Sequence, residues 1–357
     1  MVRVDDRHPF RVGLDVHNHR PPSVGAEEVV LRLTDLNLTG RSDVLQVSYG
    51  IARSDTDGFE LSGLDNVAGA YAVPINVVDT TLAIFGSRSD SSVVEEPFDT
   101  LNIDSELTRY GVTLRQPLWQ RVRGEFALAV TLERGESRTF LLGEPFDLAP
   151  GSVNGRTHVT VLRFAQEWFL RDLQQAFAIR STVSFGIDAF DTTDNGTDRD
   201  ATFVSWLGQA QYVRRLFDTA SLLVLRVDGQ VTDDPLLSIE QFSVGGWRTV
   251  RGYRENQLVR DQGVAASVEV RLPVLFDKKK NPVVQLAPFV DVGGGWNNED
   301  PAVGPATIAS VGVGLLLTPN RHVNAELYWG YAFQDFDTSE DDPQDAGFHF
   351  RVSAEAW

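Results

Sequence analysis

Residues 322–334 read His322-Val-Asn-Ala-Glu-Leu-Tyr-Trp-Gly-Tyr-Ala-Phe-Gln334, and every second side chain from Val323 to Phe333 is apolar or aromatic. The side chains between them include Asn324 and Glu326. An alternation with a period of two predicts a β-strand, because successive side chains of a strand point to opposite faces. One face of this strand suits lipid and the other suits water.

The same alternation recurs along the whole chain. In residues 218–232 a face of leucine and valine opposes Arg226 and Asp228, and in residues 177–190 a face of phenylalanine, isoleucine and valine opposes Arg180. Segments of about 10 to 14 residues have the length that a tilted strand needs to cross a bilayer with its interfaces. Sixteen segments show the pattern: 10–19, 27–37, 44–55, 64–74, 79–88, 103–116, 121–134, 155–168, 175–190, 201–214, 218–232, 263–274, 283–296, 307–318, 322–334 and 347–356.

The connections between these segments alternate in length. Short links at 38–41, 215–217 and 319–321 interleave with long ones, which lie at 134–154, 233–262, 297–306 and 335–346. No window holds the roughly 18 uninterrupted apolar residues of a spanning helix. A closed barrel is the other structure that satisfies every backbone hydrogen bond inside a bilayer, and bacterial barrels have an even number of strands. We therefore expect an all-β fold, a sixteen-stranded antiparallel transmembrane β-barrel that forms one domain over residues 1–357 in the bacterial outer membrane.

A soluble β-sandwich or a carbohydrate-binding enzyme is the main alternative, because it also has alternating strands and polar loops. Strand length, the alternation of short and long links, and Trp and Tyr residues near strand ends favour the barrel. No serine nucleophile elbow, zinc-protease helix or phosphate-binding loop is found, so we expect no enzyme activity and no cofactor.

Composition excludes further classes of function. The chain has 50 acidic and 32 basic residues and a formal net charge of −18, which argues against nucleic-acid binding. It has no cysteine, which excludes disulfides, thiolate metal sites and thiol nucleophiles. Residues 1–10 lack the apolar segment of a signal peptide, so we expect the chain to be presented without its leader.

The long connection 233–262 carries the most informative motif. It contains Gly245-Gly246 and then Thr249-Val250-Arg251-Gly252-Tyr253. This passage resembles the loop motif of the outer-membrane protein translocation superfamily, whose members include two-partner secretion transporters and barrel-assembly insertases. The resemblance implies a sixth extracellular loop that folds into the barrel lumen, where its arginine pairs with an acidic residue of the wall.

Two passages downstream strengthen the resemblance. Ser267-Val-Glu269-Val-Arg271 is similar to the family's strand after the loop, and Phe289-Val-Asp291-Val-Gly293 is similar to its next strand. Alternation independently places Glu269, Arg271 and Asp291 on the polar face. We expect Arg251 to pair with Asp291, with Glu326 as a second partner, since a guanidinium fits a carboxylate with two parallel hydrogen bonds. The other charges expected in the lumen are Arg180, Arg226, Asp228, Glu269 and Arg271.

Weaker matches to two-partner transporters lie at residues 37–43 and 110–118. The family normally carries periplasmic polypeptide-transport-associated domains before the barrel, and we expect these to be absent from this chain. His17 and His19 share a strand face without a third ligand, and residues 191–200 depart from the spacing of a calcium loop, so we expect no metal site.

The motif leaves three functions open. The first is a transporter, expected to be a monomer, which exports an unfolded partner protein and contacts membrane lipids and lipopolysaccharide. The second is an insertase that opens the seam between its first and last strands, in which case the seam should be weak or short. The third is a passive diffusion porin, for which the motif would be a coincidence.

Overall fold

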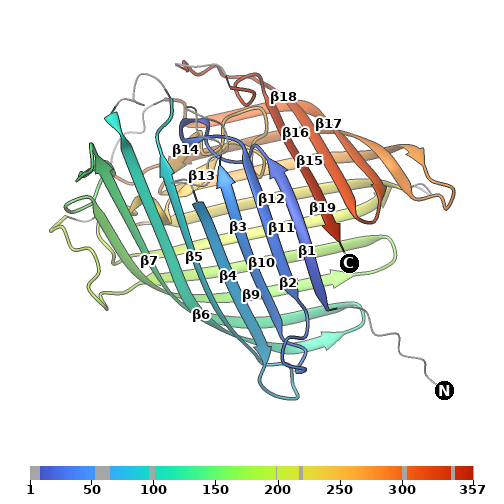
Figure 1. The fold of residues 1–357 in the computed structure, drawn as a ribbon, viewed down its shortest axis with the longest axis horizontal. Helices are drawn as coiled ribbons and strands as arrows, with labels where there is room; N and C mark the ends of the chain where they lie inside the picture. The colour runs from blue at the N-terminus through green and yellow to red at the C-terminus, as the bar shows by residue number, and fades with distance from the viewer. Residues whose placement is uncertain are drawn as a thin grey trace.

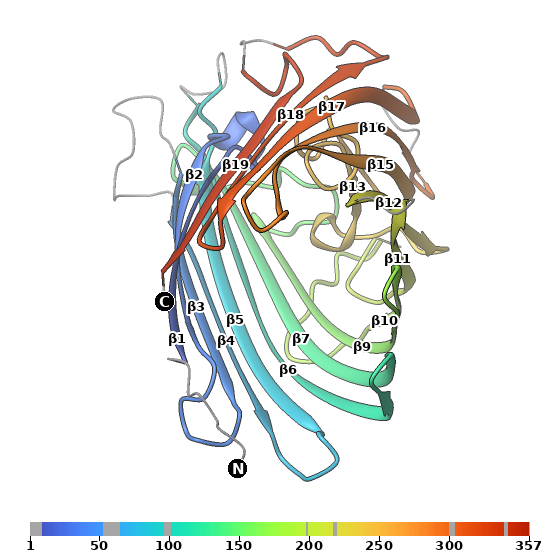
Figure 2. The same cartoon turned by 90° about the vertical axis from the view of Figure 1, so that its right-hand side faces the viewer.

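Sixteen strands pair antiparallel in the described part of the chain, and the pairing of β1 with β19 closes them into a barrel (Figures 1 and 2). The computed structural model describes residues 9–52, 65–95, 101–197, 199–216, 220–299, 304–338 and 342–356. The barrel strands are β1 (Phe10–His17), β2 (Glu28–Asp35), β3 (Val44–Ala52), β4 (Asp65–Pro74), β5 (Thr81–Ser92), β6 (Ile103–Arg121), β7 (Gly124–Leu141), β9 (Arg156–Arg171), β10 (Gln175–Gly186), β11 (Val204–Leu216), β12 (Ser221–Thr232), β15 (Gln262–Phe276), β16 (Pro282–Trp296), β17 (Thr307–Asn320), β18 (Val323–Ala332) and β19 (Phe348–Ala356).

The remaining elements are short and lie in the connections. They are the strands β8 (Glu144–Pro145), β13 (Phe242–Val244) and β14 (Leu258–Arg260), and the 3-10 turns η1 (Pro22–Val24) and η3 (Ser238–Glu240). No described helix is long and apolar enough to cross a membrane.

The two faces of the barrel differ in the way the alternation requires. On β15 and β16, Val268 and Val290 are about half exposed, whereas their neighbours Glu269 and Asp291 are buried. The exposed apolar side chains form the outer face of the closed sheet. An apolar outer face is suited to contact with lipid. The expected fold class, a sixteen-stranded antiparallel barrel, is confirmed.

The strand bounds needed correction mainly at the hairpin of β6 and β7. The expected segments 103–116 and 121–134 continue to Arg121 and Leu141, so part of the connection expected at 134–154 is strand. The continuation of β7 over residues 135–141 lacks the apolar alternation; its backbone pairs with residues 103–109 of β6, and it carries the ion pair Arg138–Glu136. The expected segment 175–190 ends at Gly186. Positions 53–55, 64, 218 and 219 of the expected segments lie outside the described residues.

The seam between the first and last strands is paired over most of its length. Six residue pairs join β1 to β19, from Val12 with Ala356 to His17 with Arg351. The buried carboxylate of Asp15 accepts hydrogen bonds from β19 on one side, and from Arg32 of β2 at 2.7 Å on the other. Polar side chains therefore reinforce the backbone pairing at the position where the barrel closes.

Candidate functional site: the loop between β12 and β15

The connection between Thr232 and Gln262 folds into an ordered structure of its own. Strands β13 and β14 pair antiparallel, with Phe242 opposite Arg260, and they support the tip of the loop at residues 245–257. Val244, Val250 and Leu258 are fully buried or nearly so, and they form one apolar cluster with Ile308 of β17. The loop is therefore packed against the barrel wall and has its own apolar contacts.

Arg251 makes the densest set of polar contacts at the tip. Its Nε donates to Asp291 Oδ2 at 2.8 Å, and its Nη2 donates to Asp291 Oδ1 at 3.0 Å. The backbone amide of Arg251 donates to the same Oδ2 at 3.0 Å. Its remaining guanidinium contacts are Nη1 to Glu269 and Nη2 to Ser267 Oγ at 3.0 Å. Three residues of β15 and β16 thus hold one loop side chain through a planar, forked group.

Two aromatic rings enclose the same guanidinium. Its central carbon lies 3.8 Å from the ring centroid of Phe289 and 4.6 Å from that of Tyr328. Both rings are buried, and a desolvated cation over an aromatic face gains more than an exposed one. Burial by itself lowers the pKa of Arg251, but the hydrogen bonds and charges of Asp291 and Glu269 outweigh it and raise the pKa above its ordinary value. The side chain therefore stays charged.

The alternation of β16 explains why the wall has its aromatic, acidic and glycine residues two positions apart. Phe289, Asp291 and Gly293 share one face: the first stacks on the guanidinium and the second accepts its hydrogen bonds. A Cβ on Gly293 would lie 2.5 Å from Val244 and 2.9 Å from Val250. The missing side chain makes room for the apolar flank of the loop.

Gly252 brings the two backbones into contact. Its φ of 93° is disfavoured for residues with a Cβ, and a Cβ there would lie 2.9 Å from the carbonyl oxygen of Gly330 on β18. The amide of Gly252 donates to Nε2 of His349 on β19 at 3.3 Å. Gly245 and Gly246 also have positive φ values, 114° and 89°, where the chain turns into the tip.

Tyr253 fixes the tip to β17 and to the residues that follow β18. Its hydroxyl lies 2.8 Å from the carbonyl oxygen of Ala309, and it accepts hydrogen bonds from the amides of Phe333 and Gln334, both at 3.1 Å. Phe336 packs edge-on against its ring at 5.9 Å. These contacts pack Tyr253 on the barrel wall.

Trp247 joins the loop to the first strand. Its ring stacks on His19 with a centroid distance of 4.2 Å, and His19 stacks in turn on His17 at 4.8 Å. Burial, with the nearby charges, lowers the pKa of His19 to about 2, so this ring is neutral in the stack. Among the described residues, no group of three or more histidine and acidic side chains is placed to hold a metal ion.

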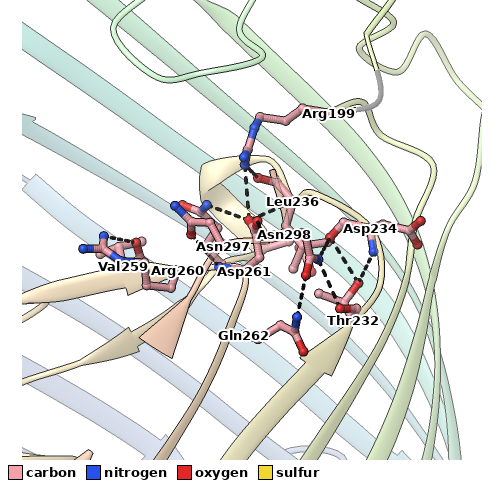
Figure 3. Close-up of polar contacts among 12 residues, drawn as sticks. Arg199, Thr232, Asp234, Leu236, Val259, Arg260, Asp261, Gln262, Asn297 and Asn298 are labelled. Atoms are coloured by element: carbon pink, nitrogen blue, oxygen red, sulfur yellow. Dashed lines mark hydrogen bonds and ion pairs between the residues drawn. The ribbon is translucent and has the colours of Figure 1, made fainter. Parts of the chain in front are cut away.

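A second polar network joins the two ends of the loop (Figure 3). The buried carboxylate of Asp261 accepts hydrogen bonds from Arg199 at 3.2 Å and from the amide of Leu236 at 3.0 Å. It also accepts from the side chain of Gln241 at 2.8 Å and from the amide of Asn298 at 3.1 Å. The loop is therefore tied where it leaves β12 and where it returns to β15.

A family model described as "Haemolysin secretion/activation protein ShlB/FhaC/HecB" matches residues 1–317. The chain belongs to this family. Its members are secretion transporters, and family and fold together make the chain an outer-membrane protein. No curated protein sequence matches the chain.

Solved structures similar to this member of the ShlB/FhaC/HecB family are barrels too. CdiB from Escherichia coli superposes with a TM-score of 0.81 at 20% identity, over 99% of this chain and 64% of that one. CdiB from Acinetobacter baumannii gives 0.73 at 14% identity, over 98% and 60%. BamA from Haemophilus ducreyi lacking POTRA domains 1–3 gives 0.66 at 13% identity, over 98% and 71%. The chain thus spans less than two thirds of the length of either CdiB chain.

The other charges expected from sequence lie around the loop in this ShlB/FhaC/HecB member. Arg180, Arg226 and Asp228 line a cavity of about 860 Å³ between loop residues 241–249 and strands β9 to β12. Arg271 donates to Glu269 at 2.7 Å. Glu326 lines a smaller cavity with Arg251, but in the described structure it forms no hydrogen bond or ion pair with that side chain.

Several contact residues were not expected from sequence. Glu269 was expected only as a charge that lines the lumen. Its position on the same face of the sheet as Asp291 could have predicted its contact with Arg251. His349, Trp247 and Tyr328 gave no signal, because their contacts join strands or loops that are far apart in the chain.

Proposed function

We propose that the chain forms a pore that exports an unfolded partner protein across the outer membrane, in two-partner secretion. In this proposal the connection 233–261 is a gate that lies in the lumen, and its motif residues Gly245, Gly246, Val250, Arg251, Gly252 and Tyr253 hold it in place. The observation that carries the proposal is the burial of Arg251 between Asp291 and Glu269. A barrel of sixteen strands is wide enough for an aqueous channel, so a gate is needed to keep it closed.

The mechanism is gating, with no chemical step and no cofactor. Removal of either partner from a buried ion pair costs several kcal/mol, about 3–5, because the other charge stays unpaired. A gate with such a contact stays closed until an entering chain provides competing contacts. Arg180, Arg226 and Asp228 would keep the channel wet and contact that chain weakly. We further propose a monomer, whose exposed apolar face contacts membrane lipids and lipopolysaccharide.

The test is single-channel conductance in a planar bilayer. R251A and D291A should each raise the conductance or cause large fluctuations, to a similar extent, because each removes one partner of the same contact. The control is R248A, which removes the same charge from an exposed position in the same loop. Variants that match the parent would overturn the gate, and a passive porin would then explain the channel.

A second candidate, insertion of other barrels, is favoured by the likeness to BamA alone. Its expected signature is a weak seam, whereas β1 and β19 pair over six residues and share the contacts of Asp15. Because the chain has no cysteine, L14C with A354C, which are paired positions, would make a single disulfide across the seam. Export through the lumen should survive this cross-link, and barrel insertion should stop.

A further inference from the structure

Between β12 and the site of Arg251, the loop also contacts another part of the barrel wall. Residues 236–240 lead from the end of β12 to β13, and Leu236 and Leu237 pack there on Val159 and Val161 of β9. Ile239 lies so close to Gly135 of β7 that a Cβ on this glycine would meet it at 3.2 Å. This descending limb, residues 236–240, therefore lies on strands of the wall other than those that hold the tip.

Glu240 ends the limb in a cluster of wall charges. Its buried carboxylate accepts a hydrogen bond from Arg163 of β9 at 2.9 Å, and it lies 3.6 Å from Arg109 of β6. Glu133 of β7 lies between the same two arginines, 2.8 Å from Arg109 and 3.4 Å from Arg163. Arg109 also donates to the carbonyl oxygen of Ile239. The arginines of β6 and β9, each paired with Glu133 of β7, thus hold the limb through one acidic side chain.

The limb and the tip of the loop contact wall clusters of opposite net charge. At the limb, two arginines and one glutamate of the wall leave one positive charge, which Glu240 of the loop neutralises. At the tip, Glu269, Asp291 and Arg271 of the wall leave one negative charge, which Arg251 of the loop neutralises. Each wall cluster is complete only while the loop is present, since an unpaired buried charge is costly.

The two contact regions lie on separated arcs of the barrel. Strands β10, β11 and β12 separate β9 from β15 in the sheet order. Eleven residue-to-residue steps join Glu240 to Arg251 and can span at most about 40 Å. This segment crosses from the contact of Glu240 on β9 to the contact of Arg251 on β15. The cavity of about 860 Å³ lies beneath this crossing segment, against β9 to β12.

The ion pairs of Arg251 with Asp291 and Glu269 form one lock on the loop. We propose that Glu240 forms a second lock, in which the loop carries the negative charge and the wall the positive one. Glu240 is a positioning residue that holds the limb on β6, β7 and β9 independently of Arg251. Release of Arg251 then frees only the tip, and full opening of the pore requires that both contacts break. The proposal deepens the gate proposed above and rests on it for its role in export. The anchoring itself is tested without export.

The first experiment measures release of each part of the loop separately. The chain has no cysteine, so S238C reports on the limb and Q257C on the tip through the rate of modification by a membrane-impermeant thiol reagent. E240Q should raise the rate at S238C several-fold and leave Q257C near the parent rate, and R251A should do the reverse. The matched control is E136Q, which removes a carboxylate from β7 that pairs with Arg138 and contacts no described loop residue of 233–261. E240D, which keeps the charge, should restore protection at S238C in part.

The second experiment measures conductance of E240Q, R251A and the double variant. The double variant should open more widely than the two single effects combined, because either lock alone leaves part of the loop across the channel. Equal labelling of S238C in E240Q and E136Q would overturn the second lock. Equal release of both reporters by either variant would show one cooperative anchor and also overturn it. Labelling as expected with the conductance of every variant equal to that of the parent would count against the proposed gate and leave the anchoring of the limb by Glu240 intact.

Discussion

The backbones of Gly252 and Gly330 are in direct contact: a Cβ on Gly252 would lie 2.9 Å from the carbonyl oxygen of Gly330, and one on Gly330 would lie 2.9 Å from Cα of Gly252. This contact places the loop tip against β18. It also sets the depth at which Arg251 enters the wall, because the two residues are adjacent in the chain.

G330A should therefore push the tip off the wall. Insertion of a methyl group into a packed contact costs about 1–3 kcal/mol, which is enough to raise the population of a released tip by roughly tenfold. Trypsin is a suitable probe, because Arg251 is buried in the seated loop. Cleavage at residues 248–254 should accelerate in G330A. G69A is the matched strand control, since its Cβ would meet only a carbonyl oxygen at 3.9 Å; equal cleavage in both variants would contradict this account.

R251K should separate charge from geometry. Lysine keeps the positive charge but has no planar fork, so it cannot donate to both oxygens of Asp291 while it also reaches Glu269 and Ser267. We expect opening events in a planar bilayer that are more frequent than in the parent and less frequent than in R251A. If opening events are as rare in R251K as in the parent, the positive charge alone holds the tip.

The loop tip should also respond to pH through Glu255. Burial raises the pKa of this carboxyl to about 7, against the opposing effects of the Trp247 amide and of Arg248. Since the folded pKa lies above the ordinary value of 4.5, the stabilising contribution is complete below about pH 4.5 and is lost as the pH rises through 7. Channel fluctuations should thus increase as the pH rises from about 4.5 to above 7.

E255Q should remove this dependence and keep the closed state at both ends of the range, because its side chain is neutral throughout. His19 does not produce the same response, since its pKa of about 2 keeps it neutral over that range. A pH profile of E255Q that follows the parent would assign the dependence to another group.

D15N should weaken the seam. Asp15 accepts hydrogen bonds from Arg351 at 2.7 Å, Ser353 at 2.6 Å and Arg32 at 2.7 Å. Loss of a buried acceptor costs about 1–3 kcal/mol. We expect the lower end, because the side chains of Arg32 and Arg351 are 44% and 36% exposed. Urea unfolding in detergent, followed by tryptophan fluorescence, should show a lower midpoint in D15N than in D90N, which alters an exposed pair on β5.

Local alternation was sufficient to predict the barrel, because a strand that separates lipid from water repeats its signal every second residue. It also placed Asp291 and Glu269 on one face of neighbouring strands. It could not extend β7 to its full length, since residues 135–141 lack the apolar alternation. Glu240 and His349 gave no local signal, because their partners lie 77 and 97 residues away in the chain.

The contact of Gly252 with His349 has a consequence for the order of assembly. His349 lies on β19, the last strand, so the loop finds its complete set of partners only after the chain has been inserted to its end. Closure of such distant contacts is slow compared with the formation of neighbouring hairpins. We therefore expect docking of the loop to finish last: a barrel that lacks its final strand leaves the amide of Gly252 without its histidine partner, and the fully seated loop is reserved for finished molecules.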